Sequence, residues 1–328
     1  MEGQWPSLRR WAGWACRFLL AGALLYFLVS TVQRDIIAAL FLQAQPAFLF
    51  LALGLLPLNL LLQYKKWQLL VHGPFPQIAV PELRASLLLG FTFGIVTPAR
   101  VGEFGGRAAG MRSVDGWTLV GLTAVDKFAG MVVTVVVGCV GLMVFCWRHP
   151  FIDPLLLTVL FSVFAVIAVL LLLRRRSGSS PVLRRHVNGA GRFQRRIASF
   201  RAALQHVRGP RLHRLLWCSI LFYLTFLLQF FLLLSAFGPV DLLSALAGIS
   251  TIFLIKTIIP PITLGELGIR EGASVYVLGH AGILAAAAFN AALLLFVINI
   301  LLPSLAGLVV LLWRPRQGLP DGVSGDVR

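Results

Sequence analysis

Hydrophobic residues gather along this chain into long runs that charged residues rarely interrupt. Six runs are long enough to cross a bilayer, whose hydrocarbon core of roughly 30 Å needs about 20 apolar residues in a helix. They cover residues 14–32, 47–71, 117–145, 154–173, 215–237 and 285–313. Two further apolar stretches, at about 81–97 and 241–262, run into mixed sequence and turn back. The pattern predicts an all-α polytopic membrane protein with about six full spans and two re-entrant helical hairpins.

The two predicted hairpins end in related sequences, "PARVGEFGGR" at 98–107 and "PITLGELGIR" at 261–270. A shift of 163 residues superposes their first proline, two of their glycines, their glutamate and their final arginine. The same shift superposes four of the spans in pairs, 47–71 with 215–237 and 117–145 with 285–313. Three crossings in each half place the halves in opposite orientations. The sequence therefore predicts an inverted repeat, which is typical of transporters with a binding site near the membrane midplane.

This repeat predicts the domain organisation. Residues 1–316 form one transmembrane domain, in which halves of about 14–145 and 154–313 are joined through 146–153. The glycine- and proline-containing tail at 317–328 has the composition of a disordered segment.

The charge distribution sets the expected topology. The net charge is +17, and the loop at 174–214 holds 12 arginines with no Asp or Glu. Positive loops stay in the cytoplasm, and counting crossings from this loop places both termini there as well. The first hairpin then enters the membrane from the cytoplasm and the second from the exterior. Because the basic residues lack interleaved aromatics and a recognition fold, we expect no nucleic-acid binding.

The paired motifs have the chemistry of a site for an anionic headgroup. Their prolines end a helix, and their glycines permit a tight reversal and the close approach of a ligand. Arg107 and Arg270 can bind phosphate bidentately beside freed amides, while Glu103 and Glu266 can hold these arginines or bind a cation or proton. The predicted binding residues are Arg100, Gly102, Glu103, Gly105, Arg107, Lys256, Gly265, Glu266, Gly268, Arg270 and Glu271.

Each of these assignments has a structural alternative. Each glutamate and the arginine four residues later can form an ion pair that only neutralises two buried charges. Lys256 can extend its ammonium group to the membrane surface. For Lys65 and Lys66, beside an interfacial tryptophan, anchoring at the cytoplasmic surface is favoured over headgroup recruitment. The four cysteines and six histidines show no metal-ligand spacing, so we expect neither a metal nor another cofactor.

Four segments together resemble a known family. "YKKW", "GFTFGIVTPARVGEFGGR", "AVDKFAGMVV" and "IIPPITLGELGIREG", in this order, are similar to the lysylphosphatidylglycerol synthase transmembrane (flippase-like) family over roughly residues 10–313. Family members often carry Glu-Arg where this chain has Asp126-Lys127, which preserves the charges. The resemblance implies a bacterial inner-membrane protein that flips or binds a lipid, such as an anionic phospholipid or a polyprenyl- or hopanoid-type lipid.

The resemblance also bears on catalysis. Bifunctional relatives carry a soluble aminoacyltransferase domain after the membrane part, whereas this chain ends about 15 residues after its last predicted span. No other catalytic motif is present, so we expect a lipid flippase-like transporter and not an enzyme. The alternative is an accessory membrane subunit or a lipid-modifying component for glycosyl or aminoacyl transfer. A separate synthase or glycosyltransferase partner and a homo-oligomer also stay open.

Overall fold

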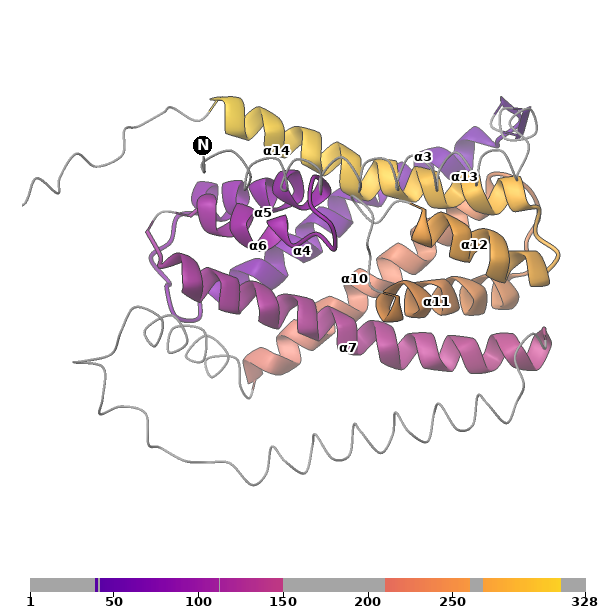
Figure 1. Ribbon diagram of the computed structural model, residues 1–328, viewed down its shortest axis with the longest axis horizontal. Coiled ribbons are helices and arrows are strands. Elements are labelled where there is room, and N and C mark those ends of the chain that lie inside the picture. Colours follow the sequence, from indigo (N-terminus) through magenta and orange to yellow (C-terminus); the bar gives the residue numbers. More distant parts are fainter. Residues whose placement is uncertain (1–38, 41, 112, 150–209, 260–267, 314–328) are drawn as a thin grey trace, which may run out of the picture.

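The computed structural model describes residues 39–40, 42–111, 113–149, 210–259 and 268–313. Every regular element in these ranges is helical (Figure 1). Several predictions lie outside them: the spans at 14–32 and 154–173, the basic loop up to residue 209, the C-terminal tail, and the motif residues Gly265 and Glu266. The last residues of the predicted loop, 210–214, are helical and begin α10.

The four other predicted spans are confirmed as apolar helices long enough to cross a membrane. They are Pro46–Val71, Gly116–Arg148, Pro210–Ser235 and Ala285–Trp313, each within a few residues of its predicted bounds. The first divides into α3 (Pro46–Gly54) and α4 (Leu56–Val71), the next two are α7 and α10, and the last comprises α13 (Ala285–Phe296), the π-helical η2 (Val297–Leu301) and α14 (Leu302–Trp313). Large apolar side chains such as Phe50, Val136 and Leu228 are exposed along them, as lipid-facing surfaces require.

Each predicted hairpin begins with a shorter apolar helix that stops near its motif. α5 (Val80–Ile95) precedes α6 (Gly102–Ala109), and α11 (Leu242–Ile258) precedes α12 (Ile269–His280). Asp241 caps α11, and the amide that Ser244 donates to it holds the pKa of this exposed carboxyl below its ordinary value. Whether these helices re-enter the membrane or cross it stays a prediction.

Glycine allows the chain to fold back tightly after α5. A Cβ atom added to Gly102 would lie 2.0 Å from the carbonyl oxygen of Phe93, and one on Gly106 would lie 2.4 Å from that of Leu89. The Gly102 amide donates a 2.6 Å hydrogen bond to Thr97 Oγ1, which closes the turn. The glycines therefore bring α6 against α5, whereas a Cβ on Gly105 would meet open space.

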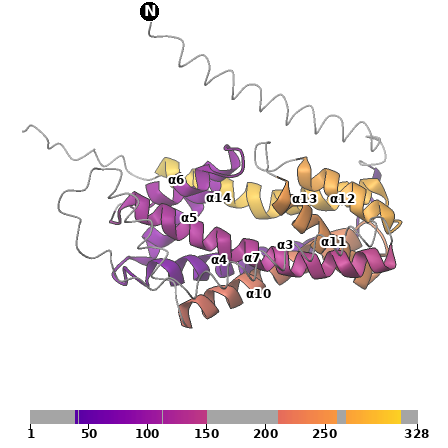
Figure 2. The same cartoon turned by 60° about the horizontal axis from the view of Figure 1, so that its bottom comes forward.

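In each half of the chain, one helix packs against a span of the other half, as Figures 1 and 2 show. α11 from the second half lies along α7 from the first, and α5 from the first half lies along α14 from the second. Small residues permit both contacts: Cβ atoms added to Gly141 and Gly307 would lie 2.4 Å from Ser250 Cβ and 2.3 Å from Leu88 O. The same element thus plays the same part in each half, as two related repeats would require. Their inverted orientation stays a prediction.

Buried apolar side chains form two clusters. One includes Phe230 and Ile252 on α10 and α11, and the other includes Trp67 and Leu83 on α4 and α5. A polar cavity is lined by residues of both clusters, so it adjoins the two cores.

The α7–α11 contact supports a first prediction. Gly141→Ala should destabilise the protein by about 1–3 kcal/mol, because the new methyl group overlaps Ser250 on the facing helix. Thermal unfolding in detergent would measure the change. Gly279→Ala is the matched control, since a Cβ there meets nothing within 4 Å, and it should unfold no earlier than the wild type. Equal behaviour of the two variants would contradict the close contact.

Candidate functional site

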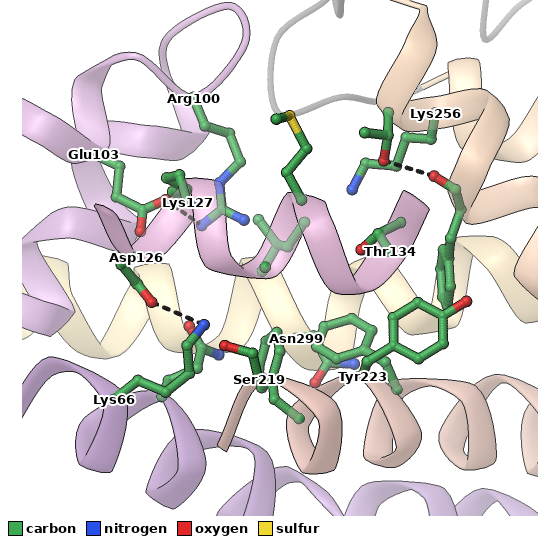
Figure 3. Close-up of a pocket in the computed structure, with 18 of the residues that line it drawn as sticks. Lys66, Arg100, Glu103, Asp126, Lys127, Thr134, Ser219, Tyr223, Lys256 and Asn299 are labelled. Atoms are coloured by element: carbon green, nitrogen blue, oxygen red, sulfur yellow. Dashed lines mark hydrogen bonds and ion pairs between the residues drawn. The ribbon is translucent and has the colours of Figure 1, made fainter. Parts of the chain in front are cut away.

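A cavity of about 360 Å³ lies among α4, α6, α7, α10, α11 and α12 (Figure 3). Its lining is rich in charge although it borders apolar spans. The basic lining residues are Lys66, Arg100, Arg107, Lys127, Lys256 and Arg270, and the acidic ones are Glu103 and Asp126. The predicted residues Arg100, Glu103, Arg107, Lys256 and Arg270 therefore share one cavity, although they come from two distant segments.

Glu103 forms ion pairs with three basic side chains of the first half. Its Oε1 atom lies 2.7 Å from Nη2 of Arg107, and its Oε2 atom pairs with both Nη2 of Arg100, at 3.2 Å, and Nζ of Lys127. The Glu103 side chain is only 4% exposed. The ion pair with the arginine four residues later, one of the two readings of the motif, is therefore present in the first half. It belongs to a larger network.

Asp126 extends this network to α4. Its Oδ1 atom lies 2.8 Å from Nζ of Lys66, and its Oδ2 atom lies 2.9 Å from Nη1 of Arg107. Arg107 is thus held between two carboxylates, and its guanidinium also lies over the ring of Trp67, with 4.6 Å from Cζ to the ring centroid. With its side chain 2% exposed, Arg107 is the buried centre of the network and not its accessible edge.

The predicted surface-anchoring role of Lys66 is wrong. Lys66 is 5% exposed, whereas the adjacent Lys65 is exposed as expected. Consecutive side chains on an α-helix point about 100° apart, so Lys65 lies on the outer face of α4 and Lys66 on the face that meets α7. Asn59, Gln63 and Lys66 follow one another at intervals of four and three residues, which places them on one face. This polar stripe in an apolar helix was the signal that a reading of flanking charge overlooked.

Two cations form the accessible edge of the network. The side chain of Lys127 is 41% exposed and that of Arg100 is 15% exposed, and Figure 3 shows both beside the cavity. Arg100 and its neighbour Ala99 each have φ of 53°, a left-handed conformation that costs about 1 kcal/mol or more per non-glycine residue. This turn directs the Arg100 guanidinium to Glu103.

In the second half, the structure describes the end of the motif, from Gly268 to Arg270. Arg270 pairs with Glu271, the next residue, at 2.6 Å, and Glu271 also accepts the Gly268 amide at 2.7 Å. Gly268 has φ of 91°, which glycine adopts most readily, and it starts α12. Lys256 contributes to the lining from α11 (Figure 3). Glu271 is thus an ion-pair partner of Arg270. The predicted pair of Arg270 with Glu266 lies outside the described residues.

A row of hydrogen-bonded neutral side chains borders the cavity, and the sequence analysis did not predict it. Asn59 donates to Asn299 at 2.8 Å, Asn299 donates to Gln229 at 2.7 Å, and Gln229 donates to the carbonyl oxygen of Ala52 at 2.8 Å. All three side chains are buried. Asn299 belongs to η2, a π-helical turn of the kind that often marks functional sites. These hydrogen bonds link α3, α4, α10 and the last span.

The network supports a prediction about Lys66. Lys66→Met should destabilise the protein by about 3–5 kcal/mol, because it removes one partner of the buried Asp126 carboxylate. Lys65→Met on the exposed face should change stability by no more than about 0.5 kcal/mol. Thermal unfolding in detergent distinguishes them, and adding Asp126→Asn to Lys66→Met should restore part of the loss. Similar stabilities of the two single variants would favour surface anchoring for both lysines.

Comparison with known proteins identifies the fold family. The family model described as the Lysylphosphatidylglycerol synthase TM region matches residues 14–307. No curated protein and no solved structure matches the chain. The matched range includes both halves and all the charged residues of the cavity. The family predicted from the sequence motifs is therefore confirmed: the chain belongs to the lysylphosphatidylglycerol synthase transmembrane family.

Proposed function

We propose that the protein is a lipid flippase-like transporter that holds an anionic headgroup in this cavity and moves it across the membrane. The observation that carries the proposal is the excess of basic over acidic side chains among the described residues of a cavity lined by both halves of the chain. Membership of the family supports a membrane function related to lipids. The transport activity and its substrate belong to the proposal.

The burial of the charges supports binding over surface attraction. Asp126 and Lys127 lie within α7, a helix apolar and long enough to cross a membrane, and Asp126 is buried. Ionised groups within such a helix are costly and generally face a polar cavity or a partner. A headgroup that enters the cavity would provide negative charge to the basic side chains.

The contacts divide the predicted residues by role. Arg107, whose terminal nitrogens face two carboxylates, would hold the network together. Arg100 and Lys127 at the accessible edge would contact the headgroup from the first half. Lys256 and Arg270 would approach it from the second half, and Figure 3 shows Lys256 across the cavity from Arg100.

The arrangement of the halves supports alternating access. In transporters with inverted repeats, the substrate lies between units that rock against each other. Here α5 packs on the second half and α11 packs on the first, so a shift of one hairpin would be coupled to a span of the opposite half. We propose that such rocking opens the cavity to each side of a bacterial inner membrane in turn, with both termini cytoplasmic. The protein would carry the lipid unchanged.

Reconstitution provides the test. Proteoliposomes containing the wild type should speed the transbilayer movement of fluorescent-tailed phosphatidic acid or phosphatidylglycerol above that in empty liposomes. Arg100→Gln and Lys127→Gln should each slow it about tenfold or more, because a charge-assisted hydrogen bond contributes about 1.5–3 kcal/mol. Bleaching by an impermeant reductant measures the lipid that remains in the inner leaflet.

Lys65→Gln is the matched control, because it removes a lysine from the exposed face of α4, and its transport rate should equal that of the wild type. Wild-type rates no higher than those of empty liposomes for both lipids would overturn the transporter proposal. Copurification of a bound synthase or glycosyltransferase in that case would favour an accessory subunit.

A further inference from the structure

Resting on the proposed function, a further inference concerns the charge of the headgroup. The first-half network contains four cations, Lys66, Arg100, Arg107 and Lys127, and two carboxylates, Glu103 and Asp126. Among the described residues that line the cavity, these two are the only acidic side chains. Counted over the described residues, the network therefore carries two positive charges in excess.

The excess positive charge lies at the accessible edge. Lys66 and Arg107 are almost completely buried. Lys66 pairs with Asp126, and Arg107 pairs with both Glu103 and Asp126. Arg100 and Lys127 instead share one oxygen atom, Oε2 of Glu103. One carboxylate oxygen serves two cations, and both cations retain donors for another anion.

The shared oxygen also fixes how far apart the two cations lie. Nη2 of Arg100 is 3.2 Å from Oε2 of Glu103 and Nζ of Lys127 is 2.5 Å from it, so these nitrogens are separated by no more than about 5.7 Å. A single phosphate group has several acceptor oxygens and can contact both. Figure 3 shows the two side chains on the same side of the cavity.

A phosphodiester carries one negative charge and would leave one positive charge of the network unneutralised. A phosphate group attached through one ester bond carries about −1.5 to −2 at pH 7 and has three strong acceptor oxygens. Among buried side chains, where screening is weak, neutralising the second charge favours the more highly charged group. This count of two excess positive charges covers the first-half network alone and leaves out Lys256 and Arg270.

We propose that the cavity selects a headgroup with a terminal phosphate, a phosphomonoester or diphosphate, over a phosphodiester headgroup, and that Arg100 and Lys127 bind that phosphate together. The cavity of about 360 Å³ has room for such a headgroup, and the hydrocarbon chains stay outside it. Free phosphate has the same chemistry, so the test includes it as a separate ligand.

The experiment measures binding of phosphatidic acid and phosphatidylglycerol with identical acyl chains to the purified protein by native mass spectrometry. Phosphatidic acid should bind about tenfold or more tightly, and its advantage should grow as the pH rises through about 6 to 8, where the second phosphate proton is lost. Lys127→Gln should remove most of this advantage, Lys127→Arg should retain it, and Lys65→Gln should leave it unchanged.

Each result bears on a different part of the proposal. Equal binding of the two lipids by the wild type, or tighter binding of phosphatidylglycerol, would overturn the selectivity inference while lipid binding itself stands. Binding of neither lipid would remove the basis of the proposed function as well. Inorganic phosphate that displaced phosphatidic acid at equal concentration would overturn the lipid form of the proposal, with free phosphate as the ligand.

Discussion

The structure of the site depends on one constraint: Glu103 and Asp126 lie buried among apolar spans and must be neutralised there. Water solvates an exposed carboxylate, but a buried one needs cations and donors from the protein itself. Arg107 meets both carboxylates, so its position relates α6 to α7. Lys66 then ties α4 to the same point. Three helices that apolar packing alone would leave free to slide are fixed at one register.

The glycines of the first motif serve this network. Glu103 and Arg107 lie on α6, which packs closely on α5, and Gly102 and Gly106 permit that approach because any side chain there would collide with the α5 backbone. The left-handed turn at Ala99 and Arg100 has an energetic cost that the ion pair with Glu103 can offset. Backbone shape and buried charge are therefore parts of a single arrangement.

The same network gives the cavity two kinds of cation. The buried ones are satisfied by carboxylates and shape the site, whereas those at the edge share an oxygen and keep donors for a ligand. The second half contributes Lys256 and Arg270 to the cavity lining, and Arg270 forms an ion pair with Glu271. The two motifs look alike in sequence. Glu103 pairs with three cations, Arg100, Arg107 and Lys127, and in the second motif Arg270 pairs with the adjacent Glu271.

The sequence by itself determined the membrane class, four of the spans, the helix breaks and the family, because apolar run length, proline and glycine act locally along the chain. It also indicated several residues of the site, since charge in an apolar segment is conspicuous. Tertiary structure alone decided the partners. Lys65 and Lys66 are equivalent in composition and flanking sequence, but one residue of helical rotation exposes the first and buries the second against Asp126, 60 positions away. Partner choice depends on which helix faces pack together, and that is a property of the folded chain.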